Sequence, residues 1–275
     1  MSSKTIKETN VDGEIQRSEV PGWREKYGVV AGITRKPYDL GLWTTEPVEG
    51  VMKRWREFRS SVPGFSLYAL GHQVHGARVE IHGTQAPYKR RPRKSQVKRA
   101  SQLTVQAPAN EWRILDGVDG HVAEGVGTML CVTVADCTPV YLLHPKTKTV
   151  ALLHAGWRGT AAGILERGVQ SLLVAATGIP GDPAEAGIVC HLGVSICGEC
   201  YEVGPEVFEA VGLPAPDTND GKGTLDVRGV LADQADALGI EKVTMSGHCS
   251  KHGEGWYSHR GGDKGRMVAY VGVPG

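Results

Sequence analysis

Reactive side chains follow two apolar segments in the middle of the chain. Cys137 ends the triplet Ala135-Asp136-Cys137, and His154 opens the run HAGWRG at 154–159. The apolar segments between 116 and 159 predict three strands. Both polar interruptions then fall at the carboxyl ends of strands, where α/β folds tend to expose backbone and chemistry. A thiol and an imidazole in these places predict either a metal site or an activated nucleophile.

Two kinds of chemistry would use the same pair of residues. A catalytic zinc site typically has three nitrogen or sulfur ligands and an open fourth position, so Cys137 and His154 would need His72 or His75 as the third ligand. In the alternative, Cys137 is a nucleophile, His154 is its base, and Asp136 or another acid orients the imidazole. The chain has no local zinc signature such as HExxH, so the residues alone leave both readings open.

An arginine beside the second interruption points to an anionic substrate. Arg158 lies between a predicted strand end and a helix predicted over 160–177, with Thr160 as its N-cap. A guanidinium group suits phosphate or carboxylate, and the first amides of a helix favour anions. The alternative is an ordinary ion pair between Arg158 and a nearby acid.

The remaining cysteines give a weaker signal. Cys197 and Cys200 have the spacing of a redox or structural zinc motif, but no second CxxC is present, and we interpret them as core or turn cysteines. The other cysteines largely lie in apolar segments of a long chain, so reduced thiols are expected rather than disulfides. The glycine-rich loop 247–265 is interpreted as either a pocket rim or a solvated loop.

Apolar periodicity predicts the elements that must position these groups. Strands are expected at 27–34, 66–70, 77–81, 187–195, 242–245 and 267–273, and helices at 48–60, 160–177, from 205, and at 226–238. No repeat or linker divides the chain. We therefore expect a polar tail or opening hairpin over 1–25 and one catalytic domain over 26–275, with a basic surface insertion around 83–110.

Composition limits the classes of partner. The chain has 275 residues, 40% hydrophobic, with a net charge of +1, so its surface as a whole should not attract nucleic acid or anionic membranes. Seven basic residues between 89 and 99 could bind nucleic acid, but without interleaved aromatic residues we interpret them as a solvated insertion. The chain has no transmembrane-length apolar window and no secretory signal, which predicts a cytoplasmic protein.

Five motifs, in this order, resemble one known family. They are QVHG at 73–76, ADCTPV at 135–140, HAGWRGT at 154–160, SICGECYEVG at 195–204 and YSHR at 257–260. Together they resemble the YfiH-type family, whose members are described as laccase-like polyphenol oxidoreductases, peptidoglycan editing factors or zinc purine nucleoside phosphorylases. The similarity covers roughly residues 28–273.

The resemblance implies a fold and a ligand set. The fold would be a mixed α/β (α+β) sandwich with mixed β-sheets flanked by helices. Zinc, with copper as the less favoured metal, would be held by His75, Cys137 and His154, and the last two would be catalytic. His72 would then have only a supporting role. Arg158 and, as a weaker correspondence, Arg35 would bind phosphate.

The activity implied is phosphorolysis of adenosine, inosine, guanosine and methylthioadenosine, with deamination of adenosine beside it. The partners would be a purine nucleoside and phosphate, and the protein a monomer or homodimer. The alternatives are a cysteine-dependent peptidoglycan-editing hydrolase, a copper polyphenol oxidase and a nucleic-acid binder resting on residues 89–99. Val194 and Gly261 depart from the residues that the family usually has at these positions, and the 83–110 insertion is longer than usual, which bears on substrate choice.

Overall fold

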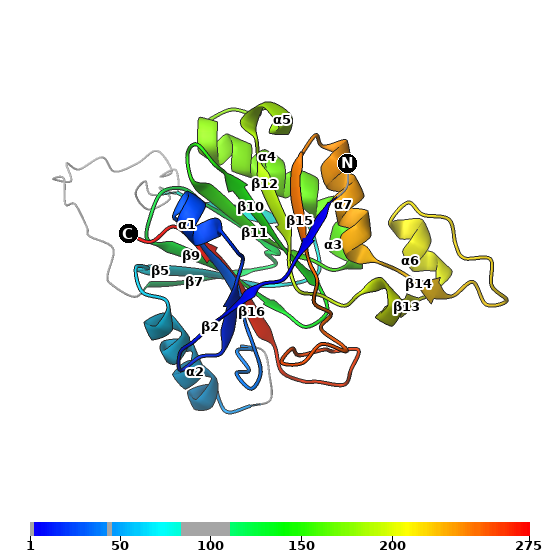
Figure 1. Cartoon of the computed structure of the whole chain (residues 1–275), viewed down its shortest axis with the longest axis horizontal. Helices are drawn as coiled ribbons and strands as arrows, with labels where there is room; N and C mark the ends of the chain where they lie inside the picture. The colour runs from blue at the N-terminus through cyan, green and yellow to red at the C-terminus, as the bar shows by residue number, and fades with distance from the viewer. Residues whose placement is uncertain (1–2, 43–45, 84–110) are drawn as a thin grey trace, which may run out of the picture.

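Two seven-stranded mixed sheets form the centre of the molecule (Figure 1). The computed structural model describes residues 3–42, 46–83 and 111–275. The basic run at 89–99 and most of the expected insertion lie outside these residues. The two mixed sheets and their flanking helices confirm the mixed α/β fold that the resemblance implied.

The first sheet holds one of the two predicted reactive strand ends, that of β11. Its strands, in spatial order, are β1 (Lys4–Ile6), β15 (Lys242–Ser246), β12 (Val189–Leu192), β10 (Thr138–His144), β11 (Thr149–Ala155), β8 (Gly120–Ala123) and β6 (Val79–His82). β10 and β11 form an antiparallel pair in which Pro139 lies opposite His154. The carboxyl end of β11 therefore lies beside the start of β10.

The second sheet holds the other reactive strand end, that of β9. Its strands, in spatial order, are β2 (Thr9–Val11), β3 (Arg17–Glu19), β4 (Val30–Thr34), β16 (Met267–Gly272), β9 (Thr128–Val134), β5 (Leu67–His72) and β7 (Glu111–Asp116). A separate two-stranded sheet pairs β13 (Glu202–Val203) with β14 (Gly223–Thr224). Because β9 and β10 belong to different sheets, the chain crosses from one sheet to the other at 135–137.

Helices pack around the two sheets (Figure 1). They are α1 (Trp23–Tyr27), α2 (Val48–Ser61), α3 (Trp157–Ala161), α4 (Ile164–Thr177), α5 (Pro183–Ala186), α6 (Pro205–Ala210) and α7 (Val227–Ala237), with a 3-10 turn η1 at Gly198–Cys200. α4 and α7 pack on the first sheet, and α2 packs on the second, at opposite sides of the molecule (Figure 1). No described helix is long and apolar enough to cross a membrane.

Alternation along the central strands explains their apolar character. In β10, Val140 and Leu142 face the helices, while Tyr141 and Leu143 face the second sheet. β9 likewise divides its side chains between the space between the sheets and the space under α2. A strand buried on both faces reads as a nearly continuous apolar run, which is why the sequence identified these strands well.

The predicted helix over 160–177 is wrong at its start. The chain forms the short α3 first, and Gly163, with φ 76°, interrupts the helix before α4 begins at Ile164. Thr160 therefore lies inside α3 and does not cap a helix. A left-handed backbone is readily adopted by glycine, and it ends the first helix here.

Candidate metal centre

Three side chains from both sheets meet at one point. His75 follows β5, Cys137 ends the crossing between the sheets, and His154 lies near the end of β11. One ligand atom from each of the three lies within 4.8 Å of the others. The imidazole rings of His75 and His154 are 4.8 Å apart at their centroids, in an edge-to-face arrangement. The fold thus brings together residues that are 79 positions apart in the chain.

A buried carboxylate holds two of these residues in place. Asp119 is fully buried, and its Oδ1 lies 2.9 Å from Nδ1 of His154. The same carboxylate accepts the backbone N–H groups of Val74, His75 and Gly76 at 3.1, 2.9 and 2.8 Å. An imidazole that donates one ring N–H to a carboxylate presents its other nitrogen to a metal, so Nε2 of His154 is the available ligand atom.

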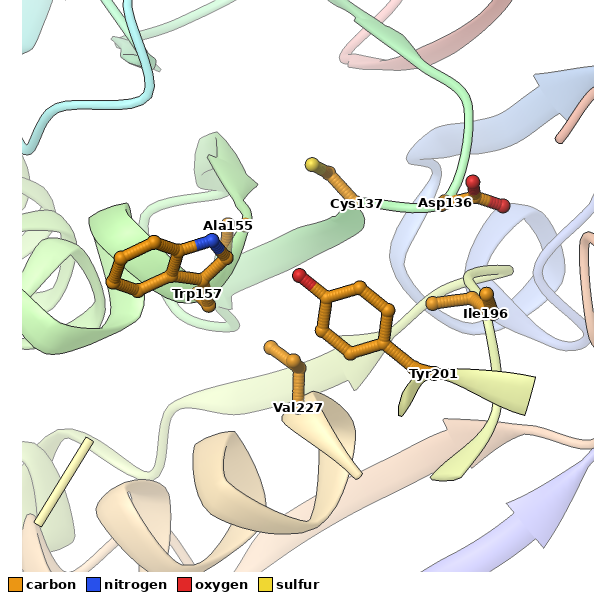
Figure 2. Close-up of a pocket in the computed structure, with 8 residues that line it drawn as sticks. Asp136, Cys137, Ala155, Trp157, Ile196, Tyr201 and Val227 are labelled. Atoms are coloured by element: carbon orange, nitrogen blue, oxygen red, sulfur yellow. The ribbon is translucent and has the colours of Figure 1, made fainter. Parts of the chain in front are cut away.

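The crossing segment is held by a second acid. Asp136 has φ 87°, in the left-handed region that non-glycine residues seldom occupy. Its carboxylate accepts the Ser250 hydroxyl and the Arg260 backbone N–H, both at 2.6 Å. Figure 2 shows its side chain pointing away from the Cys137 sulfur. Asp136 therefore shapes the loop that carries Cys137. Of the acids considered for the imidazole, Asp136 or another, it is another, Asp119, that lies beside the His154 ring.

A glycine leaves room for the three ligands. A Cβ on Gly156 would lie 2.8 Å from Sγ of Cys137 and 3.4 Å from Cδ2 of His75. The first distance is shorter than real Cβ contacts allow. The backbone of the HAGWRG run must therefore approach the site without a side chain at this position.

Charge coupling changes the acidity of the cluster. Burial raises the pKa of Cys137, but the charges and hydrogen bonds of His154 and His75 outweigh it and lower the pKa to about 6. Burial lowers the pKa of His154, but Cys137 and Asp119 raise it to about 9. Without a metal, the pair is therefore a thiolate and an imidazolium at neutral pH.

The cluster opens onto a hollow lined by cationic side chains. Around His75, Cys137 and His154 this hollow is lined by residues that include Arg158, Tyr201, His259, Arg260 and Arg266. A smaller apolar recess adjoins it and shares Cys137, Trp157 and Tyr201. In Figure 2 the Tyr201 hydroxyl points into the space between Trp157 and Cys137, and the Cys137 sulfur points away from Val227.

Comparisons with known proteins show the family of the chain. Residues 25–274 match the family described as multi-copper polyphenol oxidoreductase laccase. The chain belongs to this family.

Relatives and solved structures extend the similarity. The chain is 32% identical over 257 residues to a purine nucleoside phosphorylase, SCO2081, of Streptomyces coelicolor, covering 91% of this chain and 93% of that protein. It is 34% identical over 147 residues to the adenosine deaminase RL5 of an unknown prokaryotic organism, covering 50% and 54%. The crystal structure of YlmD from Geobacillus stearothermophilus superposes with a TM-score of 0.74 at 25% identity, covering 98% and 100%. Against several other purine nucleoside phosphorylases the chain spans 60–63% of their length.

The two arginines that the family resemblance implied as phosphate ligands lie in different places. Arg158 is exposed at the hollow, with its guanidinium 4.2 Å from the Trp157 ring centroid. Arg35 does not line the hollow; its guanidinium donates to Asn10 Oδ1 at 2.6 Å and to the Glu254 carbonyl at 3.3 Å. The weaker correspondence of Arg35 to a phosphate ligand stays a prediction, and of the two arginines only Arg158 lines the hollow. Since α3 has only five residues, anion binding at this place depends on Arg158 and not on the helix terminus.

Several residues of this laccase-family site were missed by sequence reasoning. Asp119 is the most important, and its only signal was an acid directly before the apolar segment of β8. Tyr201, Arg260 and Arg266 were not assigned to a site, although Tyr201 and Arg260 lie within motifs of the resemblance. His72 was correctly set apart: its Nδ1 lies 2.9 Å from Asp116 Oδ1 on the exposed side.

The donor set fits a catalytic zinc ion. One thiolate and two imidazoles form a three-ligand set of the kind that zinc enzymes use, and the adjoining hollow leaves access to a fourth position. Two histidines and a cysteine also occur in blue-copper sites, which add a weak axial ligand such as methionine. Gln73, which lines the hollow, is of a type that can take that axial place, so the donor set fits either metal.

Proposed function

We propose that this chain is a zinc-dependent purine nucleoside phosphorylase that also deaminates adenosine. The observation that carries the proposal is the position of the three-ligand cluster, which lies between a cationic hollow and an apolar recess with aromatic walls. A nucleoside has an apolar planar base and a polar sugar, and phosphate is an anion. The apolar recess suits the base, and the cationic hollow suits phosphate.

His75, Cys137 and His154 would hold the zinc ion. A zinc ion in this site would act as a Lewis acid, polarising an oxygen of the substrate or lowering the pKa of water. Asp119 keeps His154 in the orientation that presents Nε2, and it also fixes the backbone on both sides of His75. The site is thus preorganised, and the ligands need little movement to bind a metal.

The base would lie in the apolar recess. Trp157 and Tyr201 offer aromatic faces, and Ile196 and Val227 complete the apolar wall (Figure 2). Burial raises the pKa of Tyr201, and the nearby Cys137 raises it further. The phenol therefore stays protonated at neutral pH and can donate a hydrogen bond to a ring nitrogen or an exocyclic oxygen of the purine.

Phosphate would bind in the cationic hollow. Arg158, Arg260 and Arg266 line it, and a guanidinium group matches phosphate with two parallel hydrogen bonds. In phosphorolysis, a phosphate oxygen forms a bond to the anomeric carbon while the bond from that carbon to the purine nitrogen breaks. The products are the free base and ribose 1-phosphate. In deamination, water adds to the ring carbon that carries the amino group, and ammonia leaves.

Purified zinc-loaded protein incubated with adenosine, with and without phosphate, tests the proposal. Chromatography should show adenine and ribose 1-phosphate only when phosphate is present, and inosine in both cases. Cys137→Ala and His154→Ala should abolish both phosphorolysis and deamination. An inert wild type, or full activity in either variant, would contradict the proposal.

The alternative chemistries need their own substrates. A cysteine nucleophile would not need zinc, so cleavage of a peptidoglycan fragment that survives complete chelation would favour the hydrolase reading for Cys137. Metal analysis that finds copper in place of zinc, together with oxidation of a phenolic substrate, would favour the polyphenol oxidase reading.

A further inference from the structure

A second group of metal-binding side chains lies away from the three-ligand cluster. It consists of Cys197, Cys200, Cys249 and His252, and one ligand atom from each lies within 4.8 Å of the others. Cys197 to Cys200 is a CxxC pair, and Cys249 to His252 is a CxxH pair. The sequence led us to interpret Cys197 and Cys200 as core or turn cysteines because no second CxxC is present, but the pair that lies beside them is a CxxH.

We propose that these four residues bind a structural zinc ion. Tetrahedral coordination with zinc–sulfur and zinc–nitrogen bonds of about 2.3 and 2.0 Å places two sulfurs about 3.8 Å apart and a sulfur and a nitrogen about 3.6 Å apart. Nδ1 of His252 lies 3.3 Å from Sγ of Cys200 and 3.9 Å from Sγ of Cys197. One separation is slightly shorter and the other slightly longer than the sulfur–nitrogen edge of such a tetrahedron. Nδ1 of His252 therefore lies at about the expected distance from both sulfurs.

The backbone shapes both halves as tight turns. The N–H of Cys200 donates to the Cys197 carbonyl at 3.1 Å, and the N–H of Gly253 donates to the Cys249 carbonyl at 2.9 Å. The N–H of Cys197 also donates to Sγ of Cys249 at 3.4 Å, which is a hydrogen bond that stabilises a thiolate. The four donors are therefore held toward one another before any metal binds.

Four protein ligands leave no open position, which is typical of structural zinc sites. The ion would join two segments that form the rim of the hollow. One segment carries Tyr201, directly after Cys200, and the other carries Arg260. The Arg260 guanidinium lies 4.9 Å from the Tyr201 ring centroid and donates to the Glu202 carbonyl at 2.7 Å. Zinc at this site would thus fix the relative position of a base-binding and a phosphate-binding residue.

Zinc stoichiometry and thiol protection test this site independently of activity. After loading with zinc and desalting, wild type should hold two equivalents by elemental analysis. Cys137→Ser/His154→Asn should keep one equivalent, and Cys197→Ser/Cys200→Ser should also keep one. Cys190→Ala, which removes a buried thiol that belongs to neither group, should keep two. One equivalent in wild type and none in Cys137→Ser/His154→Asn would overturn the proposal.

Wild-type protein gives a second readout that needs no variant to fold. Alkylation followed by peptide mass analysis should show Cys197, Cys200 and Cys249 protected in zinc-loaded protein and modified at least tenfold faster after chelation. Equal rates in both states, or a disulfide among these three cysteines in protein kept under reductant, would overturn the proposal. If the second site binds zinc while Cys137 and His154 bind none, the proposed function fails and this inference stands.

Discussion

Asp119 Oδ1 lies 2.9 Å from Nδ1 of His154, and the same oxygen accepts the backbone N–H of His75. One buried carboxylate therefore positions two ligands that come from different sheets. Burial raises the pKa of Asp119, but the hydrogen bond and charge of His154 and the backbone N–H groups lower it, so that the acid is ionised at neutral pH. The negative charge also favours a cation at the site.

Asp119→Asn should weaken zinc binding at the three-ligand cluster by about 10- to 100-fold, because an amide lacks the charge and can accept at only one atom. The measurement is competition with a chelator of known affinity. Asp116→Asn is the matched control, since Asp116 is an exposed aspartate beside His72. Equal zinc affinities in the two variants would show that Asp119 does not position the ligands.

Gly156→Ala should displace Cys137 while leaving the fold intact, because the new Cβ would lie 2.8 Å from its Sγ. We expect zinc affinity to fall at least tenfold and the thermal midpoint of the zinc-free protein to change by only a few degrees. Gly50→Ala, on helix α2, where the nearest atom is the end of Arg54 at 3.7 Å, should bind zinc as wild type does.

Zinc binding at the cluster should release a proton near neutral pH. The pKa of His154 is about 9 without metal, and zinc needs its neutral imidazole, so apparent affinity should fall about tenfold per unit as pH drops from 8.5 to 6.5. Calorimetry of Cys197→Ser/Cys200→Ser in buffers of different ionisation enthalpy counts the protons released. A count of zero at pH 7.5 would contradict the thiolate–imidazolium pair.

A buried histidine pair should make the fold sensitive to acid. His82 Nε2 lies 3.0 Å from His121 Nδ1; burial and Arg113 lower the pKa of His82 to about 4, and burial with the charge of His82 lowers that of His121 to about 3. Both values lie below the unfolded value of about 6.5, so the stabilisation is complete above pH 6.5 and is lost as pH falls toward 4.

For His82 alone, the free energy of unfolding should fall by about 2 kcal/mol between pH 7 and pH 5. Urea unfolding of the zinc-free protein at both pH values measures it. The variant His82→Gln should lose correspondingly less stability over the same interval. The same pH dependence in variant and wild type would contradict the assignment.

Arg158 and Arg35 should respond differently in phosphorolysis. Arg158→Met removes a cation from the hollow and should raise the KM for phosphate at least tenfold with a smaller change in kcat. Arg35→Met should leave that KM unchanged, since its guanidinium is engaged by Asn10 and the Glu254 carbonyl. A larger rise in the KM for phosphate in Arg35→Met than in Arg158→Met would show that phosphate does not bind beside Arg158.

The central strands and the three candidate ligands were predicted for different reasons. β9, β10 and β11 are buried on both faces, so their apolar runs are long and nearly unbroken. The residues alone left Cys137 open between nucleophile and ligand, and only the family resemblance selected His75 over His72.

Other features could not be predicted because they depend on the third dimension. Asp119 reads as an ordinary turn acid until the loop after β5 folds over it. The crossing of the chain between sheets at Asp136 is set by a left-handed backbone at a residue that seldom adopts it. The group around Cys249 and His252 requires two loops 48 residues apart to pair.

The crossing at 135–137 has a consequence for how this chemistry can be inherited or engineered. His75 comes from the second sheet, His154 from the first, and Cys137 from the link between them. A shift of one sheet over the other by a single residue spacing, roughly 3.3 Å, would separate the ligands by more than a bond length. The cluster therefore cannot be moved to another scaffold as a short peptide. It exists only where both sheets are stacked in this register, and under the proposed function zinc affinity would report whether they are.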